Sequence, residues 1–344
     1  MRDKRQDPQV THQTSVHTIA VVIPVYLGAT TLEAIVGELE SFQVVCTTPS
    51  GNNFIVEEIV LVHDCGPDHS DQVIRKLSHQ SPSITPIWLS KNFGQHSASL
   101  AGIAATKSDW VVTLDEDGQH NPSDIALMLD EAIRLRAHLV YAVPKSKPEH
   151  SRWRNSTSNF AKIVASKLAG TSGPRIYSSF RLVAGEIARS LAAFAGPSLY
   201  LDVALSWICR DPGSVSVTYR QEKRVESGYS TRSLLSHFWK LALTTGTRPL
   251  RVVSLFGLLV GLLGIFYSGK IVFDRVVYGI AAEGWASVLV SILVLGGSIL
   301  FSIGVVAEYV GLVTRNSSGQ PTYLTIRDPI QSPVHGIGSG SSST

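Results

Sequence analysis

Short apolar runs alternate with longer segments from residue 19 to residue 142. The runs are rich in β-branched and aliphatic residues, which is typical of buried strands. They are Ile19–Tyr26, Glu58–Val62, Thr85–Leu89, Trp110–Leu114 and Leu139–Ala142. The segments between them predict helices at Thr30–Phe42, Asp71–Leu77, His96–Thr106 and Ile125–Arg136. The alternation predicts an α/β fold in which a mostly parallel sheet carries helices on both faces.

A different pattern begins near Val252, where two long uncharged stretches follow one another. At about 1.5 Å of rise per residue, each is long enough to cross the ~30 Å hydrocarbon layer of a bilayer. We therefore expect a hairpin of two transmembrane helices, at about 252–273 and 286–307. Two buried core helices are the alternative.

Charges around this hairpin predict its orientation. Arginines lie outside the pair, at Arg248, Arg251, Arg315 and Arg327, whereas the connecting residues 274–285 hold two acidic side chains and one basic. By the positive-inside rule, both termini and the catalytic domain face the cytoplasm. We expect a protein of the bacterial inner membrane.

These patterns divide the chain into five parts. Residues 1–17 are polar and predict a disordered extension, and residues 18–231 form the α/β catalytic domain. Residues 232–250 carry an apolar stripe beside basic residues, which predicts an amphipathic helix in the membrane interface. A helix packed on the catalytic domain is the alternative. Residues 251–314 hold the hairpin, and residues 315–344 form a cytoplasmic C-terminal segment that ends in a flexible tail.

Composition excludes several classes of protein. The net charge is only +3, so no nucleic-acid partner is expected. The three cysteines, Cys46, Cys65 and Cys209, lack the paired spacing of a zinc site and are odd in number, which argues against a disulfide framework.

The most informative short motif is LDEDGQH, from Leu114 to His120. Asp115, Asp117 and Gln119 offer hard oxygen ligands directly after a predicted strand, and Mg²⁺ or Mn²⁺ prefers such ligands together with substrate phosphates. The alternative is an ordinary acidic turn.

A second carboxylate, Asp64, also follows a predicted strand. Ligands of such sheets bind at the carboxyl ends of the strands, so Asp64 and Asp115–Asp117 should face one crevice. There Asp64 can accept a hydrogen bond from a nucleotide base. Alternatively, Asp64 or Asp68 caps the next helix, which is the interpretation we favour for Asp68.

Cations and hydroxyl groups cluster between the catalytic domain and the hairpin. The segments are Ser178–Arg181, Arg220–Arg224 and Ser227–Arg232. Arginine, lysine and hydroxyl groups suit a lipid phosphate held at the membrane surface. General basicity beside anionic lipid is the alternative.

Together, these motifs resemble one known family over about residues 18–327. The residues that carry the resemblance are IPVY (23–26), HDCGPD (63–68), LSKNFGQHSASLAGI (89–103), LDEDGQHNP (114–122), SSFRL (178–182), RVESGYSTRSLL (224–235) and AEYVG (307–311). They are similar to the inverting nucleotide-diphosphate-sugar glycosyltransferases with the GT-A fold. Within that family they look most like the polyprenol-phosphate branch, which contains dolichyl-phosphate mannose synthases and bactoprenol glucosyltransferases.

The resemblance implies a role for each matching position. The nucleotide-sugar site would be formed by Pro24, Val25, Tyr26, Asp64, Asp115 and Glu116. Asp115, Asp117 and Gln119 would bind the metal. The lipid phosphate would meet Arg181, Arg220, Lys223, Arg224, Tyr229, Ser230 and Arg232. Catalysis itself would rest on Asp117, Arg181 and Ser179.

The sequence departs from the family pattern at three places. Leu27-Gly28 replaces the usual Asn-Glu, His63 stands where a first aspartate is common, and Ser179 stands where some bacterial members have an aspartate proposed as the base. A phosphate monoester has a second pKa of about 6, so the acceptor is mostly dianionic at neutral pH. It can therefore attack without losing a proton to a base.

The expected activity is that of an inverting, metal-dependent hexosyltransferase. It would transfer a sugar from a nucleotide-diphosphate sugar to polyprenyl phosphate in the lipid bilayer. The alternatives are a same-fold enzyme with another lipid or polysaccharide acceptor, and a non-catalytic membrane scaffold. Gly257, Gly261 and Gly264 could support a homo-oligomer or, equally, pack within the hairpin.

Overall fold

The computed structural model describes residues 15–145, 178–196, 200–209, 211–220, 248–278 and 284–331. Most of the predicted N-terminal extension, nearly all of the predicted amphipathic helix and the end of the tail lie outside this part. So do Lys223, Arg224, Tyr229, Ser230 and Arg232 of the predicted lipid-phosphate site.

The described strands form one nine-stranded sheet. They are β1 (His17–Val25), β2 (Cys46–Thr47), β3 (Asn53–His63), β4 (Ile84–Leu89), β5 (Trp110–Thr113), β6 (Leu139–Pro144), β7 (Arg181–Ala184), β8 (Gly213–Val217) and β9 (Thr325–Ile326). Their order is β8-β6-β7-β5-β1-β3-β4-β9, and β2 pairs with β3. All five strands predicted from apolar runs are confirmed. Four have small shifts at their ends, whereas β3 begins five residues before the predicted Glu58.

The prediction of a mostly parallel sheet is wrong, because the sheet is mixed. The pairs β1–β3, β1–β5, β3–β4 and β6–β8 are parallel. β7 runs antiparallel to both β5 and β6, and β2 and β9 are antiparallel to their neighbours. β7 begins inside the SSFRL motif, at Arg181. Its four residues are too few to show a strand period in the sequence.

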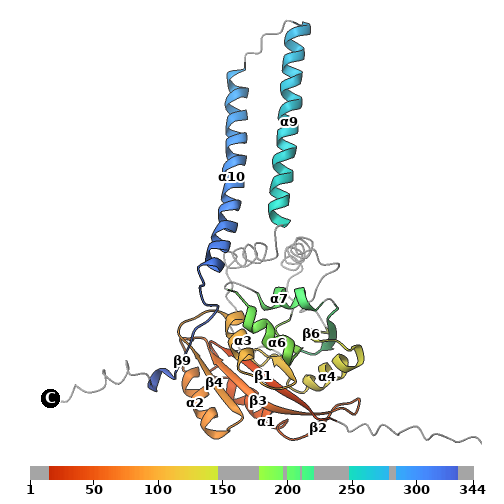
Figure 1. Cartoon of the computed structure of the whole chain (residues 1–344), viewed down its shortest axis with the longest axis vertical. Coiled ribbons are helices and arrows are strands. Elements are labelled where there is room, and N and C mark those ends of the chain that lie inside the picture. The colour runs from red at the N-terminus through yellow and green to blue at the C-terminus, as the bar shows by residue number, and fades with distance from the viewer. Residues whose placement is uncertain are drawn as a thin grey trace, which may run out of the picture.

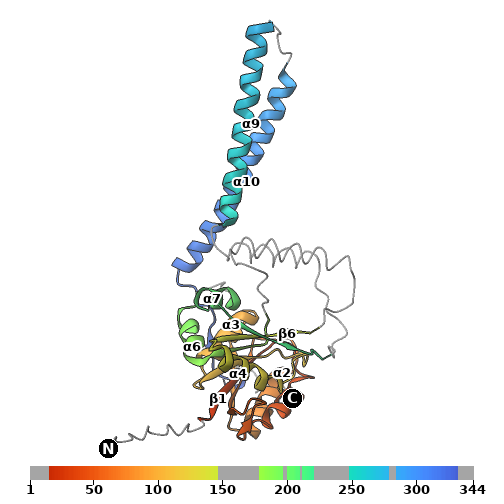
Figure 2. The same ribbon diagram turned by 90° about the vertical axis from the view of Figure 1, so that its right-hand side faces the viewer.

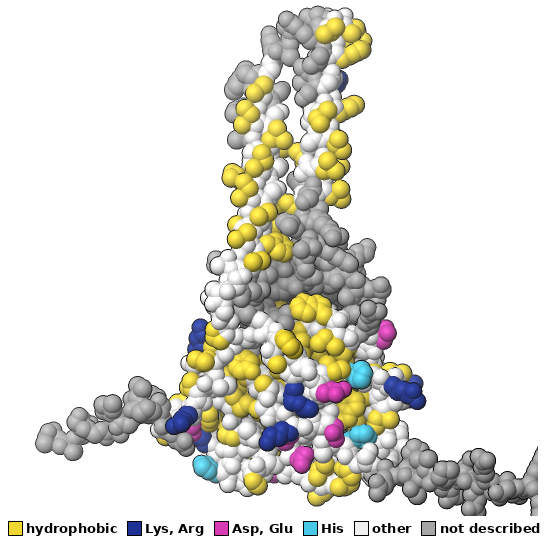
Figure 3. Space-filling model, viewed as in Figure 1, with side chains coloured by type: hydrophobic (Ala, Val, Ile, Leu, Met, Phe, Trp, Pro, Cys, Tyr) yellow, Lys and Arg dark blue, Asp and Glu magenta, His cyan; other side chains and the backbone are white. Residues whose placement is uncertain are grey.

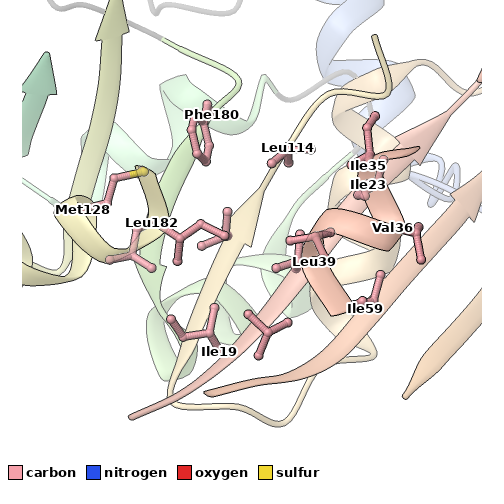
Figure 4. Packing of buried hydrophobic residues seen from close by; sticks show 14 of the residues in the cluster. Ile19, Ile23, Ile35, Val36, Leu39, Ile59, Leu114, Met128, Phe180 and Leu182 are labelled. Carbon is pink, nitrogen blue, oxygen red and sulfur yellow. The ribbon is translucent and has the colours of Figure 1, made fainter. Parts of the chain in front are cut away.

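Helices cover both faces of the sheet, as predicted (Figure 1). They are α1 (Leu32–Glu40), α2 (Ser70–Gln80), α3 (Gln95–Ala104), α4 (Asp124–Leu135), α6 (Gly185–Phe194) and α7 (Leu201–Ile208). Residues of β1 point alternately to the two faces of the sheet. Ile19 and Ile23 pack with α1, α2 and α4 on one face, whereas Ala20 and Val22 pack with α3, α6 and α7 on the other. Figure 4 shows part of the first cluster, in which Leu39 of α1 and Met128 of α4 lie against the strands.

Two long helices, α9 (Arg248–Tyr278) and α10 (Trp285–Ser317), run side by side away from the α/β domain (Figures 1 and 2). Many apolar side chains are exposed on their surface (Figure 3). Phe266 and Leu300 are two of these exposed residues. Val294–Gly311 of α10 is long and apolar enough to cross a membrane and is only 6% buried, which excludes a buried core helix for this stretch. The apolar part of α9, Gly257–Tyr267, is shorter, so the two-span hairpin stays a prediction.

The glycines of α9 do not form its contact with α10. A Cβ atom added at Gly257, Gly261 or Gly264 would have no neighbouring atom within 4 Å. Packing within the hairpin therefore does not account for these residues, and a homo-oligomer through them stays a prediction.

The packing of α3 on the sheet gives a stability prediction. A Cβ atom at Gly102 would lie 2.3 Å from Val22 Cγ1 and 2.9 Å from Val62 Cγ2, whereas one at the exposed Gly37 of α1 would meet nothing within 4 Å. We expect Gly102→Ala to lower the free energy of unfolding by about 1–3 kcal/mol through overpacking. Gly37→Ala should raise it by about 0.5–1 kcal/mol. Denaturant unfolding of both variants checks this, and equal effects would contradict the packing described.

Candidate active site

Three neighbouring parallel strands end together and form the floor of the candidate site. β1 lies between β3 and β5, and their last residues are Val25, His63 and Thr113. Backbone hydrogen bonds continue just past two of these ends, from Asp64 N to Val25 O (2.8 Å) and from Leu114 N to Val22 O (3.1 Å). The structure therefore brings Asp64 and Asp115 to one edge of the sheet, as the sequence predicted.

Of the three predicted nucleotide-site residues on the first strand, only Tyr26 presents an exposed side chain. Tyr26 is 40% exposed, whereas Val25 is fully buried in the core and Pro24 is buried as well. Pro24 and Val25 can therefore contribute to such a site only by fixing the path of the backbone.

The carboxylate of Glu116 holds the turn that follows β1. It accepts hydrogen bonds from Tyr26 N (2.8 Å) and Leu27 N (2.9 Å). A Cβ atom at Gly28 would lie 2.8 Å from Glu116 Oε2, so this departure from the family pattern fits the local packing. The structure gives Glu116 a clear role in shaping the site, and its predicted contact with the nucleotide sugar stays a prediction.

Asp64 holds a second loop in the same manner. Its two carboxylate oxygens accept hydrogen bonds from Phe93 N (2.7 Å) and Gly94 N (2.8 Å), and the residue is only 3% exposed. Burial raises the pKa of Asp64, while the two amide hydrogen bonds oppose that rise. A base N–H would have to share these oxygens with the amides.

Asp68 bonds to the start of α2, but the N-cap residue of this helix is His69, so the capping role favoured from the sequence stays a prediction. Asp68 Oδ1 accepts hydrogen bonds from the hydroxyl group (2.6 Å) and the backbone N–H (3.3 Å) of Ser70, where α2 begins. Its Oδ2 accepts one from Ala29 N (2.9 Å), which ties α2 to the turn after β1.

The side chain of Asp115 is held from two sides. The amide group of Gln95, at the start of α3, donates to Oδ1, and the hydroxyl group of Ser179 donates to Oδ2. Burial raises the pKa of Asp115, whereas the hydrogen bond from Ser179 and the nearby Arg181 charge lower it. In this arrangement the hydroxyl group of Ser179 orients the Asp115 carboxylate, and its predicted catalytic role stays a prediction.

The buried ring of His120 packs beside Asp115. Its Nδ1 accepts a hydrogen bond from Asp115 N (3.2 Å), and its ring stacks on Phe180 and meets Tyr219 edge-on, with centroids 4.9 and 5.0 Å away. The residue is 3% exposed, and burial lowers the pKa of its imidazole. A neutral ring that accepts at Nδ1 carries its proton on Nε2, which lies 4.0 Å from Asp115 Oδ2.

Asp117 and Gln119 lie in the tight turn between Asp115 and His120. Asp117 Oδ1 accepts a hydrogen bond from Gln119 N (2.9 Å), and Gly118 has a φ of 77°, a conformation that favours glycine. No group of three His, Cys, Asp or Glu side chains suited to a metal ion is found among the described residues. Two carboxylates and one amide oxygen fit a Mg²⁺ or Mn²⁺ ion that takes its other ligands from substrate phosphates and water.

Arg181, predicted to meet phosphate, is instead 3% exposed and already paired. Its guanidinium group donates to Asp202 Oδ1, and Asp202 also accepts a hydrogen bond from the hydroxyl group of Tyr141 (3.1 Å). Arg181 lies on β7, and Asp202 lies on α7. The pair fixes α7 beside the site, while the predicted catalytic and phosphate-binding roles of Arg181 stay predictions.

Arg220 is a more accessible cation. It donates to both carboxylate oxygens of Glu38 (2.7 and 2.9 Å) and to Asn121 Oδ1 (2.8 Å). Its backbone N–H donates to Gln119 O (2.9 Å), so the segment after β8 supports the predicted metal-binding turn.

Sequence reasoning missed Gln95, His120 and Asp202 as residues that shape the site. Gln95 and His120 lie inside motifs that we singled out, but nothing in the sequence gave them partners. Asp202 lies in no motif, and its pairing with Arg181 depends on where α7 packs.

The α/β domain is similar to one known protein family. Residues 20–188 match the family described as Glycosyl transferase family 2. This part of the chain is similar to glycosyl transferase family 2. The matched residues include the strand ends that carry Asp64, Asp115 and Asp117, and they extend through β7. The expected α/β domain with helices on both faces of one sheet is confirmed, with the mixed sheet as its correction. Its GT-A type stays a prediction.

Several known proteins are similar over most of this chain. The bactoprenol glucosyl transferase of Shigella phage SfX is 28% identical over 271 residues, which cover 78% of this chain and 87% of the relative. The undecaprenyl-phosphate 4-deoxy-4-formamido-L-arabinose transferase of Pseudomonas savastanoi pv. phaseolicola is 25% identical over 309 residues, or 89% of each chain. Among solved structures, glucosyl-3-phosphoglycerate synthase from Mycobacterium tuberculosis is 16% identical with a TM-score of 0.48, and the match covers 67% of this chain and 80% of that one.

The hydrogen bond from Ser179 to Asp115 gives a prediction for the α/β domain. Ser179→Ala removes a donor to a carboxylate, an interaction of about 1.5–3 kcal/mol, so kcat/KM should fall about ten- to a hundredfold. Ser179→Thr keeps the hydroxyl group and should retain most of the activity. Steady-state transfer kinetics on both variants check this. Equal losses would mean that space at position 179 matters and the hydroxyl group does not.

Proposed function

We propose that this protein transfers a sugar from a nucleotide-diphosphate sugar to polyprenyl phosphate, with inversion at the anomeric carbon. The observation that carries the proposal is the Asp115–Gln119 turn at the carboxyl end of the sheet in a domain similar to family 2, attached to helices with an apolar surface. The two relatives named for bactoprenol and undecaprenyl phosphate support a polyprenyl acceptor.

A divalent cation, Mg²⁺ or Mn²⁺, fits the oxygen set of this turn. Asp115, Asp117 and the side-chain oxygen of Gln119 would hold it. When bound, it would stabilise the negative charge that develops on the leaving nucleoside diphosphate. Asp115 is the best positioned of the three, because Gln95 and Ser179 already fix the direction of its carboxylate.

The described residues favour a reaction that depends on positioning and needs no protein base. Ser179 uses its proton in the bond to Asp115, and Arg181 uses its charge on Asp202. The polyprenyl phosphate is mostly dianionic at neutral pH and can attack directly. The enzyme then needs to align the two substrates and reduce the repulsion between their phosphates.

We place the α/β domain on the cytoplasmic side of a membrane that α9 and α10 both cross. Support comes from the apolar surface of both helices, from Arg248, Arg251 and Arg315 at their domain-side ends, and from Arg327 after β9. In this arrangement the acceptor phosphate, at the surface of the bilayer, lies on the same side as the site.

The proposal is tested with purified full-length protein, polyprenyl phosphate, Mg²⁺ or Mn²⁺ and a panel of nucleotide sugars. We expect one donor to give lipid-dependent release of nucleoside diphosphate together with a glycolipid identified by mass. Asp117→Asn should lower the rate by about a hundredfold or more, as when one contact to transition-state charge is removed.

The exposed Asp211 supplies a matched carboxylate control, since Asp211→Asn makes the same change outside the site and should leave the rate unchanged. Release of nucleoside diphosphate without glycolipid would indicate another acceptor. A folded protein with no turnover of any donor would contradict the proposed function.

A further inference from the structure

The segment that follows α10 returns to the α/β domain and completes its sheet. Residues 318–324 lead from the end of α10 to β9, which pairs antiparallel with β4 at the register Trp88–Ile326 and Leu89–Thr325. Figure 1 shows β9 on the outer side of β4, close to α2. A fully extended connection of this length reaches at most about 25 Å, so β9 keeps the edge of the sheet close to the end of α10.

An ion pair fastens this segment to the domain. Arg75 of α2 donates from Nε to both carboxylate oxygens of Asp328 (2.8 and 3.0 Å), and both side chains are largely buried. The guanidinium group lies 4.8 Å from the ring centroid of Trp88, and Asp71 accepts a hydrogen bond from its Nη1 (2.7 Å). The charge of Arg75 lowers the pKa of Asp328, which keeps the carboxylate ionised at neutral pH.

Further contacts lie on the other side of β9. The hydroxyl group of Thr322 donates to Ala195 O (2.7 Å) at the end of α6, and Tyr323 packs on the apolar cluster that also receives Phe93. The segment therefore touches both α2 and the end of α6, which pack on opposite faces of the sheet.

The strand that β9 covers leads directly into the site. Ser90, the first residue after β4, donates its N–H to Leu324 O (2.9 Å). Three residues later, Phe93 N and Gly94 N donate to Asp64, and the next side chain, Gln95, donates to Asp115. One short loop thus bonds to the C-terminal segment at its start and to the two site aspartates at its end.

We propose that residues Thr322–Asp328 act as a clamp that orders the Ser90–Gln95 loop against Asp64 and Asp115. Arg75 and Asp328 are then positioning residues for the donor side of the site, although neither lies in it. The clamp also fixes the sheet edge relative to α10, so the site keeps one orientation to the membrane. The kinetic part of this inference rests on the proposed function, whereas the structural part does not.

Hydrogen exchange on the full-length protein tests the structural part. Asp328→Asn removes the ion pair with almost no change in size, and Ile326→Pro places a proline opposite Trp88 of β4, where it lacks the N–H that a bond between the strands needs. With the clamp loosened, exchange in residues 322–328 and in residues 90–95 should both accelerate about tenfold or more. The amides of Lys107 and Ser108, which donate to Glu58, serve as an internal reference and should not change.

Glu33→Gln on α1 supplies a matched control, because it removes a partner of α2, the helix that carries Arg75. It breaks the pair with Lys76 of α2 (2.8 Å), whose two side chains are more than half exposed, and it should leave exchange in both segments unchanged. Faster exchange in residues 322–328 alone, with residues 90–95 unaffected in both clamp variants, would overturn the inference. So would unchanged exchange in both segments.

Kinetics then separate a positioning role from a merely structural one. Because the loop faces the donor side, Asp328→Asn should raise the KM for the nucleotide sugar about tenfold and change kcat less. A tenfold fall of kcat with an unchanged KM would contradict the positioning role. If the unmodified protein transfers no sugar at all, the proposed function fails, while the exchange experiment still decides whether the clamp exists.

Discussion

The candidate site depends on one repeated interaction, in which a carboxylate at the end of one strand accepts hydrogen bonds from backbone amides of another loop. Glu116 holds the turn after β1 in this way, and Asp64 holds the loop before α3. A bond between a charged acceptor and a backbone N–H is stronger than a neutral one and leaves the main chain little freedom. Removing either carboxylate would leave backbone amides without these partners, three of them partly buried, so the shape of the site and the stability of the strand ends are coupled.

Features of the fold that depend on neighbouring residues could be predicted from the sequence, whereas features that depend on residues distant in the chain could not. β1, β5 and the second half of β3 are mostly apolar, and such runs are stable only when buried, so these strands were predictable as buried parts of a sheet. The Asp115–Gln119 turn was predictable for the same reason, since it follows such a run directly. The direction of β7 was not, because it depends on how residues 146–180 return the chain to the sheet. β9 has two residues and carries no pattern of its own.

The sequence also could not predict which charged side chains pair with one another. Arg181 in the SSFRL motif was predicted to meet phosphate, yet its guanidinium group is buried against Asp202, a residue of no motif. The sequence shows that a cation is present but not which carboxylate packs beside it. Breaking such a buried pair is costly because it leaves an unpaired charge in the interior, so Arg181 is better suited to hold α7 in place than to leave Asp202 for a substrate.

These pairings bear on where the positive charge for two phosphate-bearing substrates comes from. Asp115, Glu116 and Asp117 make the edge of the sheet acidic, and a nucleoside diphosphate and a lipid phosphate would add more negative charge. The two described arginines that were predicted to meet phosphate, Arg181 and Arg220, already neutralise Asp202 and Glu38. Close like charges repel strongly when water is excluded, so binding both substrates requires cations that are not already paired. A divalent ion held by Asp115 and Asp117, as proposed, would supply two charges at the donor. For the acceptor, the sequence offers Lys223, Arg224 and Arg232, which follow β8 and precede α9, on the stretch of chain that leads from the site to the predicted membrane helices.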